Sequence, residues 1–262
     1  MKMSEITELF NGFAPEYLAE SWDNPGLLVG EEKAEIKKIL VALDATDEVV
    51  DEAVKIGADL IVTHHPMIFG SLKKINDTTN LGKKIIKLIR NNICVFAMHT
   101  NLDIAFGGVN DELAKILGLK NIGVLAESCM QNDMPNGLGR YGDIEETTLG
   151  EFAEKVKEKL GLDGIRIVGE KDRTIKKAGL CTGSGMEFMA DAVKKQCDVY
   201  ITSDIKYHDS QKAIEDGITL IDATHYGSEN IIVPVIKKFL NEKAPSIEVF
   251  ESSVNGQVFK TL

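Results

Sequence analysis

The chain is poor in cysteine, and that scarcity narrows its class. Its 262 residues include four cysteines, none of them in a C-x-x-C pair. So small and irregularly spaced a set disfavours both a disulfide framework and a zinc site built on thiolates. We therefore expect Cys94, Cys129, Cys181 and Cys197 to be small buried hydrophobic residues.

Long hydrophobic runs and an excess of positive charge are missing as well. Apolar runs such as residues 39–43 are far too short to span a bilayer, and the first ten residues contain no apolar stretch typical of a signal peptide. The 30 basic residues are outnumbered by 41 acidic ones, and the net charge of −11 has the wrong sign for a protein that binds nucleic acid through phosphates. We expect a cytoplasmic protein with neither a membrane nor a nucleic-acid partner.

What the sequence does contain is an ordinary globular composition and an internal repeat. With 44% hydrophobic and 27% charged residues, the chain can form one large domain or two compact ones. Residues 37–65 align without gaps with residues 176–204, and eight of the 29 positions are identical. Each copy predicts a strand, a helix and a second strand, at residues 39–43, 47–56 and 60–63 and at residues 178–181, 186–195 and 199–202. This pattern predicts a pair of parallel strands in each copy.

A segment of different amino-acid composition, residues 126–174, separates the two copies of the repeat. Its first part is rich in asparagine and glycine, which predicts turns, and its second part predicts a helix at residues 149–160 closed by Gly161. We find no flexible linker in it. The sequence therefore predicts an α/β fold in which two pseudo-symmetric halves, residues 1–125 and 126–262, form one body.

Four of the five histidines follow directly on predicted strands: His64, His65, His99 and His225. Open α/β sheets bind ligands beyond the carboxyl ends of their strands, so these imidazoles are candidate ligands. An acidic residue stands four positions after each of the last two. We expect Asp103 in a loop and Glu229 one helical turn after His225.

The chemistry of these side chains suits a borderline divalent metal. Three or four imidazoles and two carboxylates, with no thiolate, favour Zn, Mn, Fe, Co or Ni over Ca or Mg. They exceed the four ligands of one tetrahedral ion, whereas two ions would use them all. Both His64 and His65 can reach one site because Pro66 ends their strand. The alternative for this pair is a turn with two exposed imidazoles.

Several motifs together match a known family. They are E-S-W-D-N-P-G-L-L-V-G at residues 20–30, V-T-H-H-P at 62–66, H-T-N-L-D at 99–103, G-G-V-N-D at 107–111, I-T-S-D-I-K-Y-H-D at 201–209 and D-A-T-H-Y-G-S-E at 222–229. In combination they resemble the NIF family, whose members are also named GTP cyclohydrolase 1 type 2 homologs. One departure is the sequence T-S-D at residues 202–204, where family members usually have T-G-D.

The resemblance implies two α/β halves and a di-metal centre. It implies that the two ions are held by His64, His65, Asp103, His225 and Glu229. Among these, Glu229 is the implied bridging ligand. The resemblance also implies a toroidal hexamer, and this chain has the length of members without the domain that longer relatives insert between the halves.

Other polar residues near the predicted strand ends have two interpretations each. His99 either orients Asp103 or forms a structural cap. Asp204 and His208 either transfer protons to a bound substrate or mark the start of a helix. Both interpretations place these residues close to the carboxyl ends of strands.

Two loops are also candidates for a role. The T-G-S-G loop at residues 182–185 either binds a phosphate through its backbone N–H groups or is a tight turn. We expect residues 22–24, a Trp-Asp-Asn corner, to pack at a contact between halves or between subunits.

Two functions fit these features. The leading hypothesis is a di-metal hydrolase that activates water for attack on a small, nucleotide-like substrate. The alternative is a non-catalytic metal-binding or metallochaperone-like scaffold. An open coordination position with a general acid beside it favours the enzyme, whereas a closed site favours the scaffold.

Overall fold

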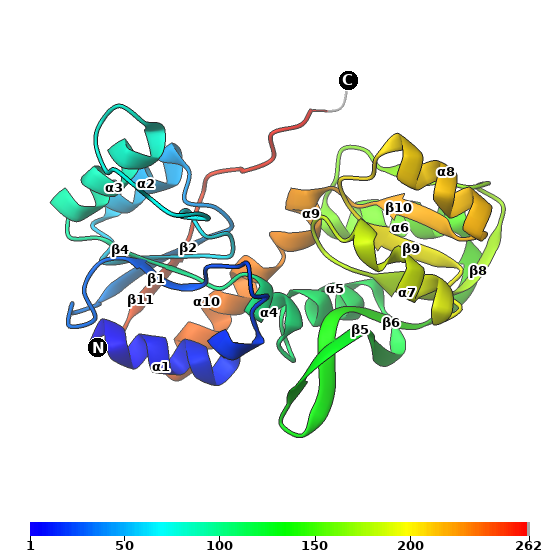
Figure 1. Cartoon of the computed structure of the whole chain (residues 1–262), viewed down its shortest axis with the longest axis horizontal. Helices are drawn as coiled ribbons and strands as arrows, with labels where there is room; N and C mark the ends of the chain where they lie inside the picture. The colour runs from blue at the N-terminus through cyan, green and yellow to red at the C-terminus, as the bar shows by residue number, and fades with distance from the viewer. Residues whose placement is uncertain (261–262) are drawn as a thin grey trace. The chain divides into compact units, whose positions relative to one another are not determined.

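The computed structural model describes residues 1–260 and contains two compact units (Figure 1). The first unit comprises Met1–Leu102 and Ile232–Gly256, and the second comprises Asp103–Ile231 with residues 257–260. The chain therefore returns to the first unit near its C-terminal end. The boundary that the repeat suggests, between residues 125 and 126, stays a prediction about the two halves.

The first unit is built on a five-stranded sheet with the strand order β1-β4-β3-β2-β11. Its strands are β1 (Gly26–Val29), β2 (Lys38–Ala42), β3 (Leu60–Thr63), β4 (Cys94–Ala97) and β11 (Glu248–Glu251). The four strands from β4 to β11 pair in parallel, and β1 pairs antiparallel with β4. Every residue of β3 and β4 is buried, as expected for parallel strands covered on both faces.

Helices cover both faces of this sheet. They are α1 (Met3–Phe13), the 3-10 turn η1 (Glu16–Leu18), α2 (Asp47–Ile56), α3 (Asn80–Arg90) and α10 (Ile232–Lys243). In Figure 1, α2 and α3 lie above the strands, and α1 and α10 lie below them. The predicted helix at residues 47–56 is confirmed; the Thr46 side chain caps its first turn, and Gly57 ends it in the left-handed conformation.

The second unit contains a six-stranded sheet with the order β5-β6-β8-β9-β10-β7. Its strands are β5 (Lys120–Gln131), β6 (Met134–Thr148), β7 (Arg166–Val168), β8 (Thr174–Leu180), β9 (Val199–Thr202) and β10 (Thr219–Asp222). The inner strands β8, β9 and β10 are parallel, and the other pairs are antiparallel. A mixed α/β fold with two sheets is therefore confirmed.

The helices of the second unit are short. They are α5 (Val109–Leu117), α6 (Leu149–Leu160), the 3-10 turn η2 (Met186–Phe188), α7 (Met189–Lys194), α8 (Tyr207–Asp216) and α9 (His225–Glu229), while α4 (Thr100–Ile104) contains the boundary between the units. The predicted helix at residues 149–160, closed by Gly161, is confirmed. Within residues 1–260, none of the helices has the length and apolar character needed to cross a membrane.

The repeat predicted from the sequence is visible in matching hydrogen bonds. In the first unit, Asp59 Oδ2 accepts from the backbone N–H of Lys37 and Lys38 at 2.8 and 2.9 Å. In the second unit, Asp198 Oδ2 accepts from the two equivalent lysines, at 2.7 and 3.0 Å. The second lysine of each pair donates from Nζ to the carbonyl at the end of the intervening helix. The identical residues of the repeat thus fix the same strand-helix-strand unit twice.

Replacing either aspartate with alanine is expected to destabilise its own unit. Each change removes two hydrogen bonds to a charged acceptor, and each aspartate is partly exposed, so we expect a loss of about 1–3 kcal/mol in the free energy of unfolding for Asp59→Ala and for Asp198→Ala. Urea denaturation measures both losses. The exposed Asp163→Ala variant is the control, and equal stability of all three variants would contradict a structural role for the repeated aspartates.

The structure corrects two local predictions. The Asn- and Gly-rich stretch after residue 126 is a long hairpin of β5 and β6 rather than a series of turns, with Asn132 and Asp133 as its turn. At Gly137, a Cβ atom would lie 1.9 Å from the Ala126 carbonyl oxygen, so this glycine is needed for close strand contact. Asp103 lies in helix α4 instead of a loop.

Candidate metal centre

Three histidines gather at the carboxyl ends of two neighbouring strands in the first unit. His64 and His65 follow β3, His99 follows the parallel strand β4, and each offers one ring nitrogen such that all three lie within 4.8 Å of one another. The backbone N–H groups of His64 and His65 both donate to the Leu43 carbonyl, at 3.2 and 3.0 Å. The regular strand has therefore ended at this pair, which lets both rings turn to one side.

Each ring of this trio is held through its Nδ1 atom. His64 Nδ1 lies 2.8 Å from the Met98 carbonyl oxygen, and His65 Nδ1 lies 2.8 Å from Asp44 Oδ1. A bond from Nδ1–H to an oxygen fixes the tautomer in which Nε2 carries the lone pair. Metal-binding histidines almost always have such an oxygen partner on the nitrogen that faces away from the ion.

Asp23 is a site residue that the sequence reasoning placed only in a packing corner. Its carboxylate accepts from His99 Nδ1 at 2.8 Å and from the backbone N–H of Thr100 at 2.9 Å. Burial alone would raise the pKa of Asp23, but the bonds from His99 and Thr100 outweigh it and lower the pKa to about 2. Asp23 is thus an anion that orients the His99 ring. The predicted role of His99 in orienting Asp103 stays untested.

A second group of candidate ligands lies in the second unit, on helix α9. His225 and Glu229 are its first and last residues, and His225 Nε2 lies 3.1 Å from Glu229 Oε2. The predicted spacing of one helical turn is confirmed. His225 Nδ1 lies 2.7 Å from Asp204 Oδ2, so this ring also has an oxygen partner on Nδ1. Asp204 therefore positions His225.

Charge governs the protonation of this second group. The hydrogen bond to Glu229 raises the pKa of His225 to about 9; burial opposes the shift, and Asp204 adds to it. Glu229 itself is buried. A divalent ion that binds His225 through Nε2 must displace a proton there.

Two residues of the second group have unusual backbone conformations. Asp204 and Thr224 have positive φ values of 56° and 58°. Thr224 directly precedes His225, and its side chain accepts from the Gly227 N–H to start helix α9. A β-branched residue in the left-handed region is strained, and such strain concentrates at functional sites.

The loop at residues 182–185 lies against Glu229, and three of its four backbone N–H groups donate within the protein. The backbone N–H of Thr182 donates to Asn110, that of Gly183 to Ser228, and that of Gly185 to Thr202. These three donors are used within the protein, which favours the interpretation as a tight turn, and the phosphate interpretation stays untested. A Cβ atom at Gly183 would lie 2.1 Å from Glu229 Oε1, so the glycine makes room for that carboxylate.

Asp103 and Cys181 of the second unit lie close to the loop at residues 182–185 and to Glu229. The Asp103 side chain accepts from Thr182 Oγ1 at 3.4 Å, and its backbone carbonyl accepts from Asn110 Nδ2 at 3.0 Å. Burial raises the pKa of the Cys181 thiol well above its usual range, and the charges of Asp103 and Glu229 raise it further. The thiol is therefore protonated and structural, as expected, and the candidate donors are imidazoles and carboxylates.

His208 lies apart from the contacts described so far. It is exposed on α8, its Nδ1 lies 3.0 Å from Gln211 Oε1, and its ring packs edge-on against Tyr207. Helix α8 begins at Tyr207, so His208 lies in its first turn. Asp204 contacts His225, and the paired role of Asp204 and His208 in proton transfer stays a prediction.

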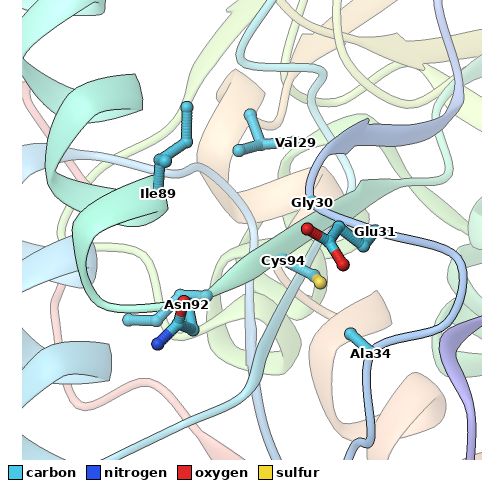
Figure 2. Close-up of a pocket in the computed structure, with 8 residues that line it drawn as sticks. Val29, Gly30, Glu31, Ala34, Ile89, Asn92 and Cys94 are labelled. Carbon is cyan, nitrogen blue, oxygen red and sulfur yellow. The ribbon is translucent and has the colours of Figure 1, made fainter.

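A cavity of about 400 Å³ in the first unit lies at the opposite end of β4 from His99 (Figure 2). Its walls include Val29, Glu31, Ile89 and Cys94. Burial raises the pKa of the Cys94 thiol, so its sulfur is protonated there. The lining residues of this cavity include one thiol and one carboxylate, too few donors for a metal site of the kind predicted.

Comparison with known proteins places the chain in a family. The model of the family described as Duf34/NIF3 (NGG1p interacting factor 3) matches residues 1–257. The chain belongs to the Duf34/NIF3 family. The NIF resemblance and the α/β fold predicted from the sequence are thereby confirmed.

Individual Duf34/NIF3 relatives match over nearly the whole chain. A Clostridium perfringens protein named GTP cyclohydrolase 1 type 2 homolog is 38% identical over 247 residues, which is 94% of each chain. A Bacillus cereus protein related to NIF3 has a crystal structure that aligns with a TM-score of 0.94 at 29% identity, covering 100% of this chain and 99% of that one. A Staphylococcus aureus protein of known structure aligns with a TM-score of 0.91 at 33% identity, with the same coverage.

The donor chemistry of this Duf34/NIF3 chain fits a borderline divalent ion. The first unit contains a group of imidazole nitrogens, and the second unit contains an imidazole beside carboxylate oxygens. Four rings are held at Nδ1 by an oxygen atom: His64, His65, His99 and His225. These groups could hold a metal ion, and they are typical of zinc, manganese, iron, cobalt and nickel sites.

Proposed function

We propose that the chain is a metal-dependent hydrolase acting on a small, nucleotide-like substrate. Its two divalent ions would be held by His64, His65, Asp103, His225 and Glu229. The observation that carries the proposal is the grouping of candidate ligand atoms: ring nitrogens of His64, His65 and His99 lie within 4.8 Å of one another, and His225 Nε2 lies 3.1 Å from Glu229 Oε2. Groups of imidazoles, and an imidazole beside a buried carboxylate, are typical ligands of divalent metals.

The chemistry expected from this centre is hydrolysis. Bound divalent ions lower the pKa of water and polarise the bond to be cleaved. The chain's own residues orient the ligands: Asp44 holds His65, and Asp204 holds His225. Glu229 is buried, and its negative charge would offset repulsion between two bound cations. The choice of a nucleotide-like substrate is supported by the name of the relatives, GTP cyclohydrolase 1 type 2 homolog.

Metal content and a hydrolysis panel test the proposal together. After reconstitution with Zn or Mn, elemental analysis is expected to give close to two ions per chain, and the loaded protein is expected to hydrolyse at least one member of a panel of nucleotides and phosphoesters. One ion or fewer per chain, unchanged by added metal, would contradict the dinuclear centre. Two ions without hydrolysis across the panel would favour the non-catalytic scaffold.

His64→Ala and His65→Ala are each expected to lose metal without unfolding. The chain is long enough to be stable from its own hydrophobic core, and each change removes one candidate nitrogen ligand. Metal content and circular dichroism of both variants measure the two effects separately. A variant that retains full metal content would show that its histidine belongs to the turn after β3.

His208→Ala is expected to slow turnover while leaving the metal content unchanged. The exposed ring of His208 contacts Gln211 on its own helix and lies outside the proposed ligand set. As a proton donor it would contribute about 10²–10⁴-fold to the rate. Single-turnover kinetics on the loaded variant measures the change, and an unaltered rate would remove His208 from the mechanism.

We also propose that the protein assembles as a toroidal hexamer, as the family resemblance implies. Size-exclusion chromatography with light scattering measures the mass directly. A mass of one or two chains at working concentrations would contradict the assembly. It would leave the metal proposal standing, because every proposed ligand comes from a single chain.

A further inference from the structure

Two large aromatic side chains are exposed beside the histidine trio of the first unit. Trp22, the single tryptophan of the chain, is 55% exposed, and Phe69 is also 55% exposed. Their ring centroids lie 5.7 Å apart, and each lies 6.0 Å from the centroid of the His99 ring. The two rings form a continuous apolar surface at the edge of the candidate ligands, which we call the aromatic pair.

The aromatic pair is held in place by the same residues that orient His99. Asn24 Nδ2 donates to the Ile68 carbonyl at 2.7 Å and so ties the segment of Trp22 to the loop of Phe69. Asp23, between Trp22 and Asn24, bonds the His99 ring. A shift of the pair would therefore disturb these bonds, which fixes the distance from the pair to the ligand nitrogens.

Ring geometry indicates what kind of molecule suits this surface. The Trp22 and Phe69 planes are inclined at 35° to each other, whereas His99 stands edge-on to both, at 74° and 70°. Both rings of the pair remain more than half exposed beside the His99 ring. Leaving two large aromatic rings half exposed is unfavourable in water, and a planar ligand ring that stacks on them removes that area from solvent.

We propose that Trp22 and Phe69 are positioning residues that stack a planar heteroaromatic ring of the substrate beside the histidine trio. The inference rests on the proposed function in naming that ring as part of the molecule hydrolysed. Stacking on a tryptophan or phenylalanine is tolerant of ring type, so the pair orients the substrate and contributes affinity, whereas the choice among rings belongs to other groups. Neither residue carries a metal ligand atom.

The single tryptophan makes binding directly observable. Guanosine added to metal-free protein is expected to quench the fluorescence of Trp22 and to saturate, whereas ribose, which lacks a ring to stack, is expected to leave it unchanged. The same titration with zinc-loaded protein shows whether the ring binds in the presence of the ions. Equal quenching by ribose, or no saturation by guanosine in either form, would overturn the proposal.

Leucine variants separate ring stacking from simple apolar bulk. Phe69→Leu is expected to weaken guanosine binding about tenfold, and Phe69→Tyr, which keeps a ring, is expected to restore it. Trp22→Leu, measured by calorimetry because the reporter is lost, is expected to show a similar or larger loss. The matched control is Phe250→Leu, a partly exposed phenylalanine on β11 of the same unit, which is expected to bind as the parent does.

Metal content distinguishes a failure of this inference from a failure of the proposed function. All the variants are expected to hold as much zinc as the parent; loss of zinc in Phe69→Leu would show that the pair only supports the ligands, and would overturn the positioning role. Guanosine affinity equal to that of the parent in both leucine variants would also overturn the positioning role. A protein that binds guanosine through the pair but hydrolyses no substrate would contradict the proposed hydrolysis and leave the stacking role intact.

Discussion

Gly183→Ala is expected to remove metal from the second unit and to destabilise the fold at the same time. Gly183 has a φ of +61°, and a Cβ atom there would lie 2.1 Å from Glu229 Oε1 and 3.3 Å from His225 Nε2. The left-handed conformation costs an alanine about 1 kcal/mol, and displacing a buried carboxylate adds to that. We expect the free energy of unfolding to fall by about 2–3 kcal/mol and the metal content to drop below that of the parent.

Gly217→Ala is the matched control for this change. Gly217 also has a positive φ, of +77°, but nothing lies within 4 Å of the position of its Cβ atom. It should therefore show the conformational penalty of about 1 kcal/mol alone and retain full metal content. Urea denaturation and elemental analysis compare the two variants. Parental metal affinity in Gly183→Ala would mean that the loop at residues 182–185 does not fix the Glu229 carboxylate.

The α/β core was predictable because its signals are local. The repeated lysine pair, the aspartate 21 or 22 positions later and the apolar runs between them mark the same strand-helix-strand unit twice, and matching hydrogen bonds now explain why those residues are identical. The helix at residues 149–160 was equally clear, since its capping box and its closing glycine are both sequence features.

The hairpin of β5 and β6 was missed because glycine has two opposite uses. In isolation Gly137 and Gly142 indicate turns, but in the structure each allows a strand to approach its neighbour, with a Cβ atom expected within 2.6 Å of a partner carbonyl oxygen. Sequence alone does not distinguish a glycine chosen for its φ from one chosen for its missing side chain.

At the site, the candidate ligands were predictable and their supporting residues were not. His64, His65 and His225 follow strands, a pattern that the sequence displays. The acceptors that hold the rings come from elsewhere: Asp23 precedes His99 by 76 residues, and Asp44 precedes His65 by 21. Only the tertiary fold brings such pairs together. The W-D-N sequence at residues 22–24 could have indicated the role of Asp23, because an aspartate beside a tryptophan can hold a histidine ring through a hydrogen bond as well as pack.

Glu229→Gln is expected to weaken the binding of both metal ions together. A carboxylate offers two oxygens, whereas an imidazole offers one nitrogen lone pair, so Glu229 is the best candidate to bridge. Its Oε1 faces Gly183 and its Oε2 lies 3.1 Å from His225 Nε2. Glutamine keeps the size of the side chain and one good acceptor, but it removes the buried negative charge that offsets repulsion between two cations.

A bridging carboxylate at Glu229 and a single-ion imidazole at His225 therefore predict different metal-binding curves for their variants. Even residues one layer outside a metal site change affinity about 10–100-fold, so loss of the bridge should exceed that range for both ions. His225→Ala, in contrast, should release nearer one ion than two. Calorimetric titration of each variant with zinc or manganese separates the cases, with Glu215→Gln, the same change at an exposed position of α8, as the control. Two ions bound as tightly in Glu229→Gln as in the parent would reduce Glu229 to a charged neighbour of the site.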